Sequence, residues 1–551
     1  MGKRILIILL LTILCVSVTP DLSCIDIELN PTVAIVRNTK TDYKQLSPNE
    51  RREDFYTYYN MICKYNPSIE YEKLNLGVDF KSREEFYIKR VNSAKNDFEF
   101  FSIMRGIVSD LTEYNEYMEY FLIDTFLPEF IDFINNDYVL RNDYKGNFRK
   151  KGINIYKSME EFIPPYYDLY RDTSYKFQYV TADQYVCVDR EKELTGWTLI
   201  SINDAPISDF MSKELFSEKL NFDENNKLYR NFITLNELDG TPAKVQLRDP
   251  NGNIVEKDLY ADITAEMTYK YGYWFTEYPR IKPIYENKVN DKIYMQHYLD
   301  IENNYGYISL DDFDNHKMEF MDYLRDVFDE LRQTDNIIID LRDNHSGNLK
   351  VMLEKFYPMI HNKDADFSFT YEVGIDTMNE FWIRNSMQIL DSEKYYKLRN
   401  ENNVRYVDYN LHAVGNPDIP DKNIYYLVDN NNSSYTEQYA NLIKENNLGT
   451  VIGTRMAGDG LRNGSVGFTI PNTQLIFSTN IFKATNPDGS NNNFYGTMPD
   501  IYCPSSYDDF WKMVEIAKEN QNIYEYENML KYDTVLKRAI EEVKKNNENI
   551  I

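Results

Sequence analysis

Two adjacent serines stand where a polar turn meets a predicted helix, and serine hydroxyls in that setting can act as nucleophiles. Ser433 and Ser434 follow the apolar run Ile424–Val428 and precede Tyr435–Glu445, where apolar residues recur at helical spacing. Backbone N–H groups and the positive end of a helix dipole favour a developing oxyanion at this place. A serine at a helix N-terminus is most often a capping residue, so position alone leaves both interpretations open.

Two further stretches have the same form of an apolar strand that runs into a polar loop. Asn336–Asp340 is rich in β-branched residues and leads into a loop that ends at Gly347-Asn348. Val451–Ile452 starts another apolar run that ends in a glycine-rich loop at Gly458–Gly460. Strand, turn, helix and strand in this order predict a βαβ unit with a parallel sheet.

Taken together, these stretches resemble the tail-specific, or C-terminal processing, serine peptidase family. The family pattern is Gly-Tyr-Ile, then Asp-Leu-Arg-x-Asn-x-Gly-Gly, then Ser-x-x-Glu on a helix, then a glycine-rich loop, then Pro-Asp. The resemblance implies a ClpP/crotonase-like α/β core, serine-type peptidase activity and polypeptide substrates, and we expect neither a metal nor another cofactor. The matching segments in this chain, in order, are Gly306-Tyr307-Ile308, Asp340-Leu341-Arg342-Asp343-Asn344, Ser434-Tyr435-Thr436-Glu437, Gly458-Asp459-Gly460 and Pro499-Asp500.

The resemblance also assigns roles within the site. Ser434 stands at the nucleophile position, and Ser433 is the alternative if the register differs by one residue. The backbone amides of Ser346, Gly347 and Ser434 are the candidate oxyanion donors. Ser346 replaces a family glycine, which a backbone donor tolerates only where φ is negative.

The bases that the family uses are missing from the matching positions. The family histidine matches Asn115, the lysine of the Ser-Lys branch matches Asp459, and the glutamate before Pro-Asp matches Asn493. A carboxylate is too weakly basic to accept the proton of a serine hydroxyl efficiently at neutral pH. We therefore predict a degenerate catalytic site, with His345 as a candidate substitute base beside the oxyanion loop. Arg455 would stay protonated, and helical phase directs Lys444 away from the serine.

Composition limits the partners that this chain can have. The formal net charge of −27 argues against binding to nucleic acid or to an anionic membrane surface, since phosphates would be repelled. Aromatic residues make up 15% of the 551 residues, which is ample for folded cores, and the length predicts two or three domains.

The N-terminus predicts an exported protein. Lys3 and Arg4 precede the apolar run Ile5–Val18, as in a secretory signal peptide, and this run is too short for stable membrane insertion. After removal of this segment four cysteines remain, and they are too scattered to indicate a zinc cluster or a disulfide framework.

Changes in periodicity along the chain predict its organisation. Gly196–Asn203 resembles a strand of PDZ-like domains, Asp364–Asn410 reads as an irregular aromatic insert, Tyr117–Asn135 as a helix and Gln474–Ser478 as a core strand. The predicted parts are a signal peptide (1–23), a helical region (24–150), a small β domain (151–290), an α/β core (291–510) and C-terminal helices (511–551).

Three functional hypotheses follow. The first is a secreted pseudoenzyme of the tail-specific peptidase family, which binds polypeptides or processes them slowly. The second is an active serine-type peptidase that uses an unrecognised base such as His345. The third is a non-enzymatic secreted structural or adhesive protein, which accounts for the acidity but not for the ordered motifs.

Overall fold

We describe the chain from a computed structural model. The described residues are 45–71, 73, 79–95, 97–111, 117–119, 177–181, 184–187, 193–207, 220–222, 228–230, 232–233, 243–259, 285–286, 292–293, 295–310, 318–344, 351–374, 396–401, 404–458, 465–472, 476–480, 483–486, 489–519 and 521–550.

A six-stranded sheet lies at the centre, in the order β13-β14-β15-β19-β20-β24. β13 and β14 pair antiparallel, and every later neighbour pairs in parallel. Parallel strands need crossover connections, and α11 (Met318–Leu331) and α16 (Ser434–Glu445) lie in two of them. The predicted α/β core is thereby confirmed. The strands are β13 (Met295–Asp300), β14 (Tyr305–Leu310), β15 (Asn336–Asp340), β19 (Asn423–Val428), β20 (Thr450–Gly453) and β24 (Ile501–Tyr502).

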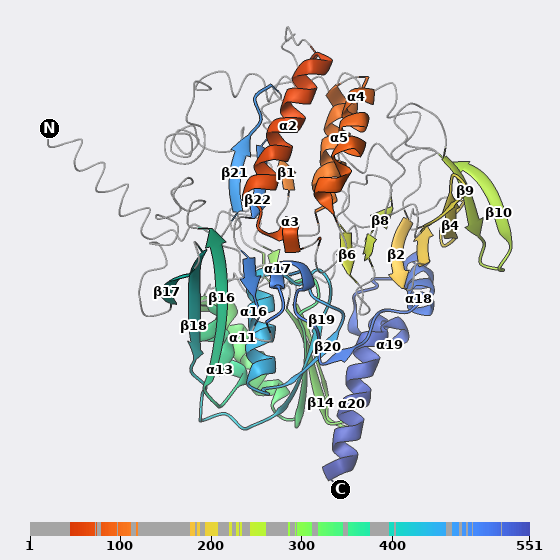
Figure 1. The fold of residues 1–551 in the computed structure, drawn as a ribbon. Helices are drawn as coiled ribbons and strands as arrows, with labels where there is room; N and C mark the ends of the chain where they lie inside the picture. Colours follow the sequence, from red (N-terminus) through yellow and green to blue (C-terminus); the bar gives the residue numbers. More distant parts are fainter. Residues whose placement is uncertain are drawn as a thin grey trace.

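Alternating side chains bury both faces of this sheet. On β15, Ile337 and Ile339 pack into the cluster that contains α11 and α16 residues, whereas Ile338 packs with the C-terminal helices. Figure 1 shows α11 and α16 on one side of the strands and α20 on the other. The C-terminal helices are α18 (Tyr507–Lys518), α19 (Tyr526–Tyr532) and α20 (Thr534–Ile550).

A second, antiparallel sheet stands where an irregular insert was predicted between Asp364 and Asn410. Its order is β17-β18-β16-β23, so that prediction is wrong for the described residues. Phe367 and Phe369 of β16 are buried while Asp366 and Ser368 are exposed, and this period of two is that of a half-buried strand. The helical segments η7 (Met352–Phe356) and α13 (Tyr357–Ile360) precede it. The strands are β16 (Ala365–Gly374), β17 (Tyr396–Glu401), β18 (Val404–Ala413) and β23 (Lys483–Thr485).

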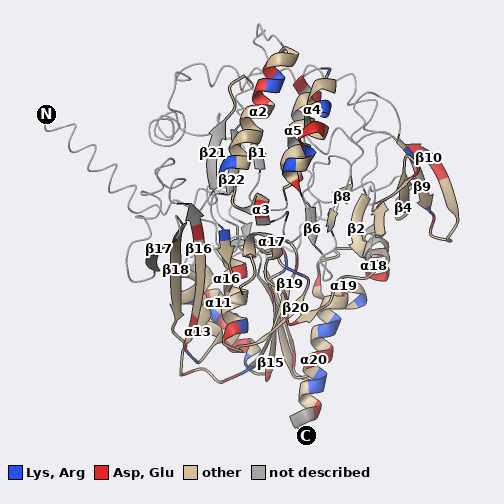
Figure 2. Cartoon of the chain, viewed as in Figure 1, with Lys and Arg blue, Asp and Glu red and all other residues tan. Residues whose placement is uncertain are grey.

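The N-terminal region is helical, as predicted. Its elements pack around buried aromatic residues such as Phe55 and Tyr87. Figure 2 shows acidic and basic residues along these helices, while the central strands β19 and β20 are drawn without charge. The elements are α2 (Pro48–Tyr65), α3 (Ser68–Tyr71), η4 (Phe80–Arg83), α4 (Glu84–Ser93) and α5 (Asp97–Ser109).

Two predictions fail where this region meets a distant hairpin. β1 (Tyr117–Glu119) is a strand and not the start of a helix, because it pairs antiparallel with β22 (Ile476–Asn480); residues 120–135 lie outside the described residues. β22 in turn pairs with β21 (Ser465–Thr469), so the strand predicted at Gln474–Ser478 belongs to this separate sheet and not to the core.

The predicted small β region contains an antiparallel sheet in the order β10-β9-β4-β3-β2-β8. Asn203 and Asp204 at φ +49° and +63° make the tight turn between β4 and the short β5 (Ala205–Pro206). Its likeness to a PDZ domain stays a prediction. The strands are β2 (Phe177–Thr181), β3 (Gln184–Cys187), β4 (Thr198–Ile202), β8 (Phe232–Ile233), β9 (Ala243–Arg248) and β10 (Ile254–Leu259).

Two findings concern the described part of the chain as a whole. None of its helices combines the length and the hydropathy needed to cross a bilayer. Cys63, Cys187 and Cys503 are free thiols, and Cys24 lies outside the described residues.

Candidate active site at the start of α16

Three loops meet at the carboxyl ends of the parallel strands β15, β19 and β20, where α/β proteins commonly bind ligands. The first is the turn Leu341–Asn344 after β15, closed by Asn344 N–H, which donates to the Leu341 carbonyl at 3.0 Å. Asp343 has φ +64°, a conformation that aspartate tolerates better than most residues. Its N–H donates at 3.1 Å to Asp429 Oδ1 in the loop after β19. The first two loops are therefore joined directly.

Asn432 connects all three loops. Its buried side chain donates from Nδ2 to the carbonyls of Leu341 and Asn344 and accepts from Asp429 N–H at 2.7 Å. Its own carbonyl accepts from Ala457 N–H at 2.8 Å, in the loop after β20. An amide can donate and accept at once, which explains why asparagine suits this place.

α16 begins at Ser434, with Ser433 as its N-cap in extended backbone at φ −145°. The Ser433 hydroxyl makes no capping hydrogen bond, so Ser433 is the N-cap by its position and backbone conformation only. Thr436, in the first turn, donates from Oγ1 to Asn344 Oδ1 at 2.7 Å, and both side chains are fully buried. The start of α16 is thus held against the turn after β15.

Glu437, one turn into α16, is fully buried and accepts at 2.9 Å from Asn492 Nδ2. Asn492 belongs to the short helix α17 (Asn492–Tyr495), and its Nδ2 also donates to Asn486 Oδ1 at 2.9 Å. Residues three apart on a helix share a face, so Glu437 lies on the same side of α16 as Ser434. The carboxylate of this site therefore comes from α16 itself, while the segment before Pro499 contributes an amide.

Comparison with known protein families identifies the core that carries this site. The sequence profile of peptidase family S41 matches residues 304–503, which span the three loops, α16 and α17. This core belongs to peptidase family S41. The assignment agrees with the predicted tail-specific serine peptidase family.

Several solved structures align with most of the chain at low identity. The structure of mature CPAF complexed with lactacystin is 11% identical, covers 86% of this chain and 98% of its own, and has a TM-score of 0.49. The photosystem II D1 C-terminal processing protease is 12% identical, covers 83% of this chain and 93% of its own, and has a TM-score of 0.31. The tricorn protease is 15% identical, covers 68% of this chain and 29% of its own, and has a TM-score of 0.24. No curated protein sequence matches the chain.

An S41 peptidase needs a base beside its serine, and the described histidines each have another partner. His361 is buried in the core, where its Nε2 bonds Tyr426 Oη at 2.8 Å, and burial lowers its pKa to about 3. His297 lies 3.5 Å from Glu330, and His412 Nδ1 lies 2.8 Å from Asp366 Oδ1 on the exposed face of β16 and β18. His316 and His345 lie outside the described residues.

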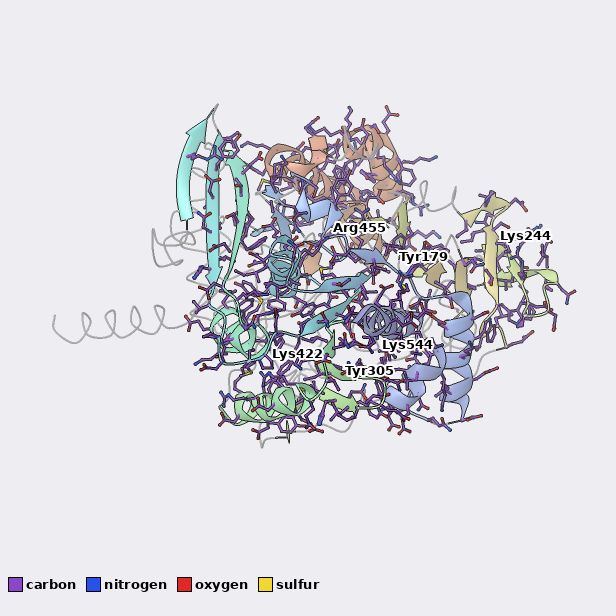
Figure 3. All side chains as sticks on the ribbon, turned by 90° about the horizontal axis from the view of Figure 1, so that it is seen from below. Tyr179, Lys244, Tyr305, Lys422, Arg455 and Lys544 are labelled. Carbon is purple, nitrogen blue, oxygen red and sulfur yellow. The ribbon has the colours of Figure 1, made fainter. Side chains whose placement is uncertain are left out.

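The basic residues nearest in sequence to α16 are also engaged. Lys444, in its last turn, donates to the Met498 carbonyl and lies 3.6 Å from Asp500. Arg455, in the loop after β20, donates from Nη1 to the Tyr495 carbonyl at 3.2 Å. Figure 3 labels Arg455 near the centre of the molecule, between the N-terminal helices and the core.

Several predicted site residues cannot be placed. Asn115, His345, Ser346, Gly347 and Asp459 lie outside the described residues. Asn493 is part of α17, next to Asn492, whose side chain contacts Glu437. Among the described residues, no group of three or more histidine, cysteine or acidic side chains could hold a metal ion.

Sequence reasoning missed the residues that hold the loops together. Asn432 stands in the run Asn430–Asn432, which predicted a turn and no more. Thr436 and Asn344 lie within recognised motifs, but their hydrogen bond joins residues 92 positions apart. A polar residue at a buried position of an amphipathic helix was the available signal for Thr436.

Proposed function

We propose that this protein is an exported member of peptidase family S41 that binds polypeptides at the start of α16 and hydrolyses them slowly or not at all. The network of Asn432, Asn344 and Thr436 carries the proposal, because it keeps the first turn of α16 beside the turn after β15. Binding of an extended chain needs that arrangement of backbone groups, whereas hydrolysis needs a base as well.

The proposed loss of hydrolytic activity rests on the residues that stand at the positions of the family bases. Asn115, Asp459 and Asn493 replace the histidine, lysine and glutamate that the family resemblance implies. An amide has no basic lone pair at neutral pH, and an ordinary carboxylate is several pKa units too weak. Ser434 would therefore keep its proton in the resting protein.

A second candidate function is serine-type hydrolysis with His345 as the base. Its immediate predecessor Asn344 is bonded to Thr436 in the first turn of α16, the helix that begins at Ser434. If His345 is that base, His345→Ala should abolish peptide hydrolysis and leave peptide binding unchanged.

Export belongs to the same proposal. The segment Met1–Val18 has the charge and the apolar length of a secretory signal. Expression of the full chain in a secreting host, followed by N-terminal mass spectrometry, should yield a mature protein in the medium that starts near residues 18–24. Retention of the protein inside the cells, with its N-terminus intact, would contradict export.

Equilibrium binding of fluorescently labelled, denatured casein tests the binding claim. Wild type and Ser434→Ala should bind with the same affinity, because the backbone and not the hydroxyl holds the chain. Asn432→Asp, which turns two donated hydrogen bonds into repulsion of two carbonyls, should bind about tenfold more weakly. Absence of binding in folded wild type would favour the non-enzymatic structural or adhesive role.

A further inference from the structure

A buried cluster of charges joins the C-terminal helix α20 to the turn after β15. Arg342 donates from Nε to Asp340 Oδ1 at 2.9 Å and from Nη2 to Asp340 Oδ2 at 2.6 Å. The same Nη2 donates to Asp533 Oδ2 at 2.6 Å. The two aspartate side chains are only 6% and 5% exposed, so water screens neither ion pair strongly.

The charges of this cluster keep the guanidinium in place. Burial alone would lower the pKa of Arg342, but the carboxylates of Asp340 and Asp533 outweigh it and raise that pKa well above its ordinary value. Tyr307 Oη donates to Asp340 Oδ2 at 2.9 Å, which satisfies a further lone pair of this buried carboxylate. Burial of a charge is tolerated only with such complete pairing.

Asp533 divides its two oxygens between two tasks. Oδ1 caps α20 by accepting from Leu536 N–H at 3.0 Å, and Oδ2 accepts from Arg342. The positive end of the helix dipole offsets the negative charge that a second carboxylate adds to the cluster. Capping alone would be served equally well by asparagine, so the ion pair is what the charge of Asp533 provides.

The turn that Arg342 anchors is the one that holds the start of α16. Arg342 N–H donates to Asp340 Oδ1 at 3.1 Å, which sets the direction of the chain as it leaves β15. The next residue, Asp343, has φ +64° and bonds Asp429, and Asn344 bonds Thr436. Arg342 therefore belongs to the same turn as the residues that bond Asp429 and Thr436.

We propose that Asp533 is a positioning residue for the candidate site: through Arg342 it fixes the turn Leu341–Asn344, and through that turn the first turn of α16. The effect of this positioning on peptide binding rests on the proposed function. Figure 3 looks nearly along α20, which carries Lys544. Residues of this helix share a buried cluster with Ile338 of β15 and Leu427 of β19, so α20 packs on one face of the central sheet.

Hydrogen–deuterium exchange of two isosteric variants tests the proposal without any ligand. Asp533→Asn keeps a capping side chain and removes the charge that Arg342 pairs with. Asp509→Asn is the matched control, since Asp509 Oδ2 accepts from Thr534 N–H and Ser506 N–H, each at 3.1 Å, at the same end of α20. In Asp533→Asn, amides of 336–344 and 429–437 should exchange about tenfold faster than in wild type, and in Asp509→Asn they should not.

Exchange that changes only within 526–550, or equally in both variants, would overturn the proposal and leave Asp533 as a helix cap. Casein affinity then separates this inference from the proposed function. If wild type binds, Asp533→Asn should bind about tenfold more weakly and Asp509→Asn as wild type; unchanged binding by Asp533→Asn would overturn the positioning role. If wild type does not bind, the proposed function fails, and exchange alone still decides whether Asp533 fixes the turn.

Discussion

Asn432 is the residue on which the three strand-end loops converge. The buried amide donates to two carbonyls and accepts from one N–H, so the isosteric Asn432→Asp replaces two attractions by two repulsions. We expect a loss of roughly 2–4 kcal/mol in the free energy of unfolding, measured by urea denaturation. Asn430→Asp is the control: Asn430 is half-buried and contacts Tyr229 Oη at 3.2 Å, and an aspartate can accept from that hydroxyl. Equal losses in both variants would refute this role of Asn432.

His361 makes stability depend on pH. Burial holds its pKa near 3, below the ordinary 6.5, so the folded protein keeps the ring neutral while the unfolded chain protonates it. The contribution of the neutral His361 ring to the free energy of unfolding is therefore complete above pH 6.5 and declines as pH falls towards 3. Relative to His361→Phe, wild type should lose roughly 2–3 kcal/mol between pH 6.5 and 4.5.

Urea midpoints of both proteins across this pH range give the measurement. Tyr426→Phe is the control, because it removes the hydroxyl 2.8 Å from Nε2 but leaves the imidazole buried, so the decline with pH should persist. A wild-type curve parallel to that of His361→Phe would show that the ring is protonated in the folded state.

At the scale of elements, β19 and β20 approach so closely that one position demands glycine. Gly453 at the end of β20 has φ +142°, and a Cβ there would lie 1.8 Å from the Val428 carbonyl oxygen. Gly453→Ala should cost at least about 3 kcal/mol of stability or prevent folding. Gly489→Ala is the matched control, since Gly489 has φ +86° but no atom within 4 Å of the added carbon. Thermal unfolding of both variants gives the measurement. Similar decreases in the unfolding temperature of the two variants would exclude close packing as the cause.

Sequence patterns predicted the elements where local signals and tertiary structure agree. Ile424–Val428 and Tyr435–Glu445 fall within one residue of β19 and α16, because a buried strand and an amphipathic helix have different periods. Tyr117–Glu119 was misjudged because its strand exists only through a partner more than 350 residues later. Around Phe367 the sequence carries the signal of a strand, because apolar and polar residues alternate there, although the many aromatic residues also suit an irregular insert.

The candidate site was predicted less completely than the fold. The order of motifs identified the strand ends and the start of α16, because each of these features is determined by a short stretch of sequence. The contacts of Asn492 with Glu437 and of Asp533 with Arg342 join residues 55 and 191 positions apart. Such pairs follow from how helices pack on the sheet, which no local pattern contains.

At the scale of the whole molecule, two distant segments build one unit. Asn472, in the hairpin of β21 and β22, donates from N–H at 2.7 Å and from Nδ2 at 3.0 Å to the buried Asp54 of α2. Ile470 packs into the same helical cluster, and Figure 1 shows this hairpin beside α2. The chain thus leaves the core after Gly458, completes the N-terminal unit and returns through β23.

Asn472→Asp should loosen this connection, because it sets a carboxylate against Asp54 and within reach of Glu53. We expect faster hydrogen exchange in 465–480 and 48–60, with exchange in β15, β19 and α16 unchanged. Asn472→Ser, which removes the side-chain donors without adding charge, should show a smaller effect. Faster exchange throughout the core would mean that the hairpin also supports the central sheet.

Digestion of a denatured-protein mixture, read by mass spectrometry, tests the central claim most directly. Wild type and Ser434→Ala, both shown to be folded, should produce the same small set of peptides, while Asp459→Lys, which restores a family base, should produce new ones. Abundant peptides that appear with wild type and vanish with Ser434→Ala would contradict the account and establish an active serine peptidase.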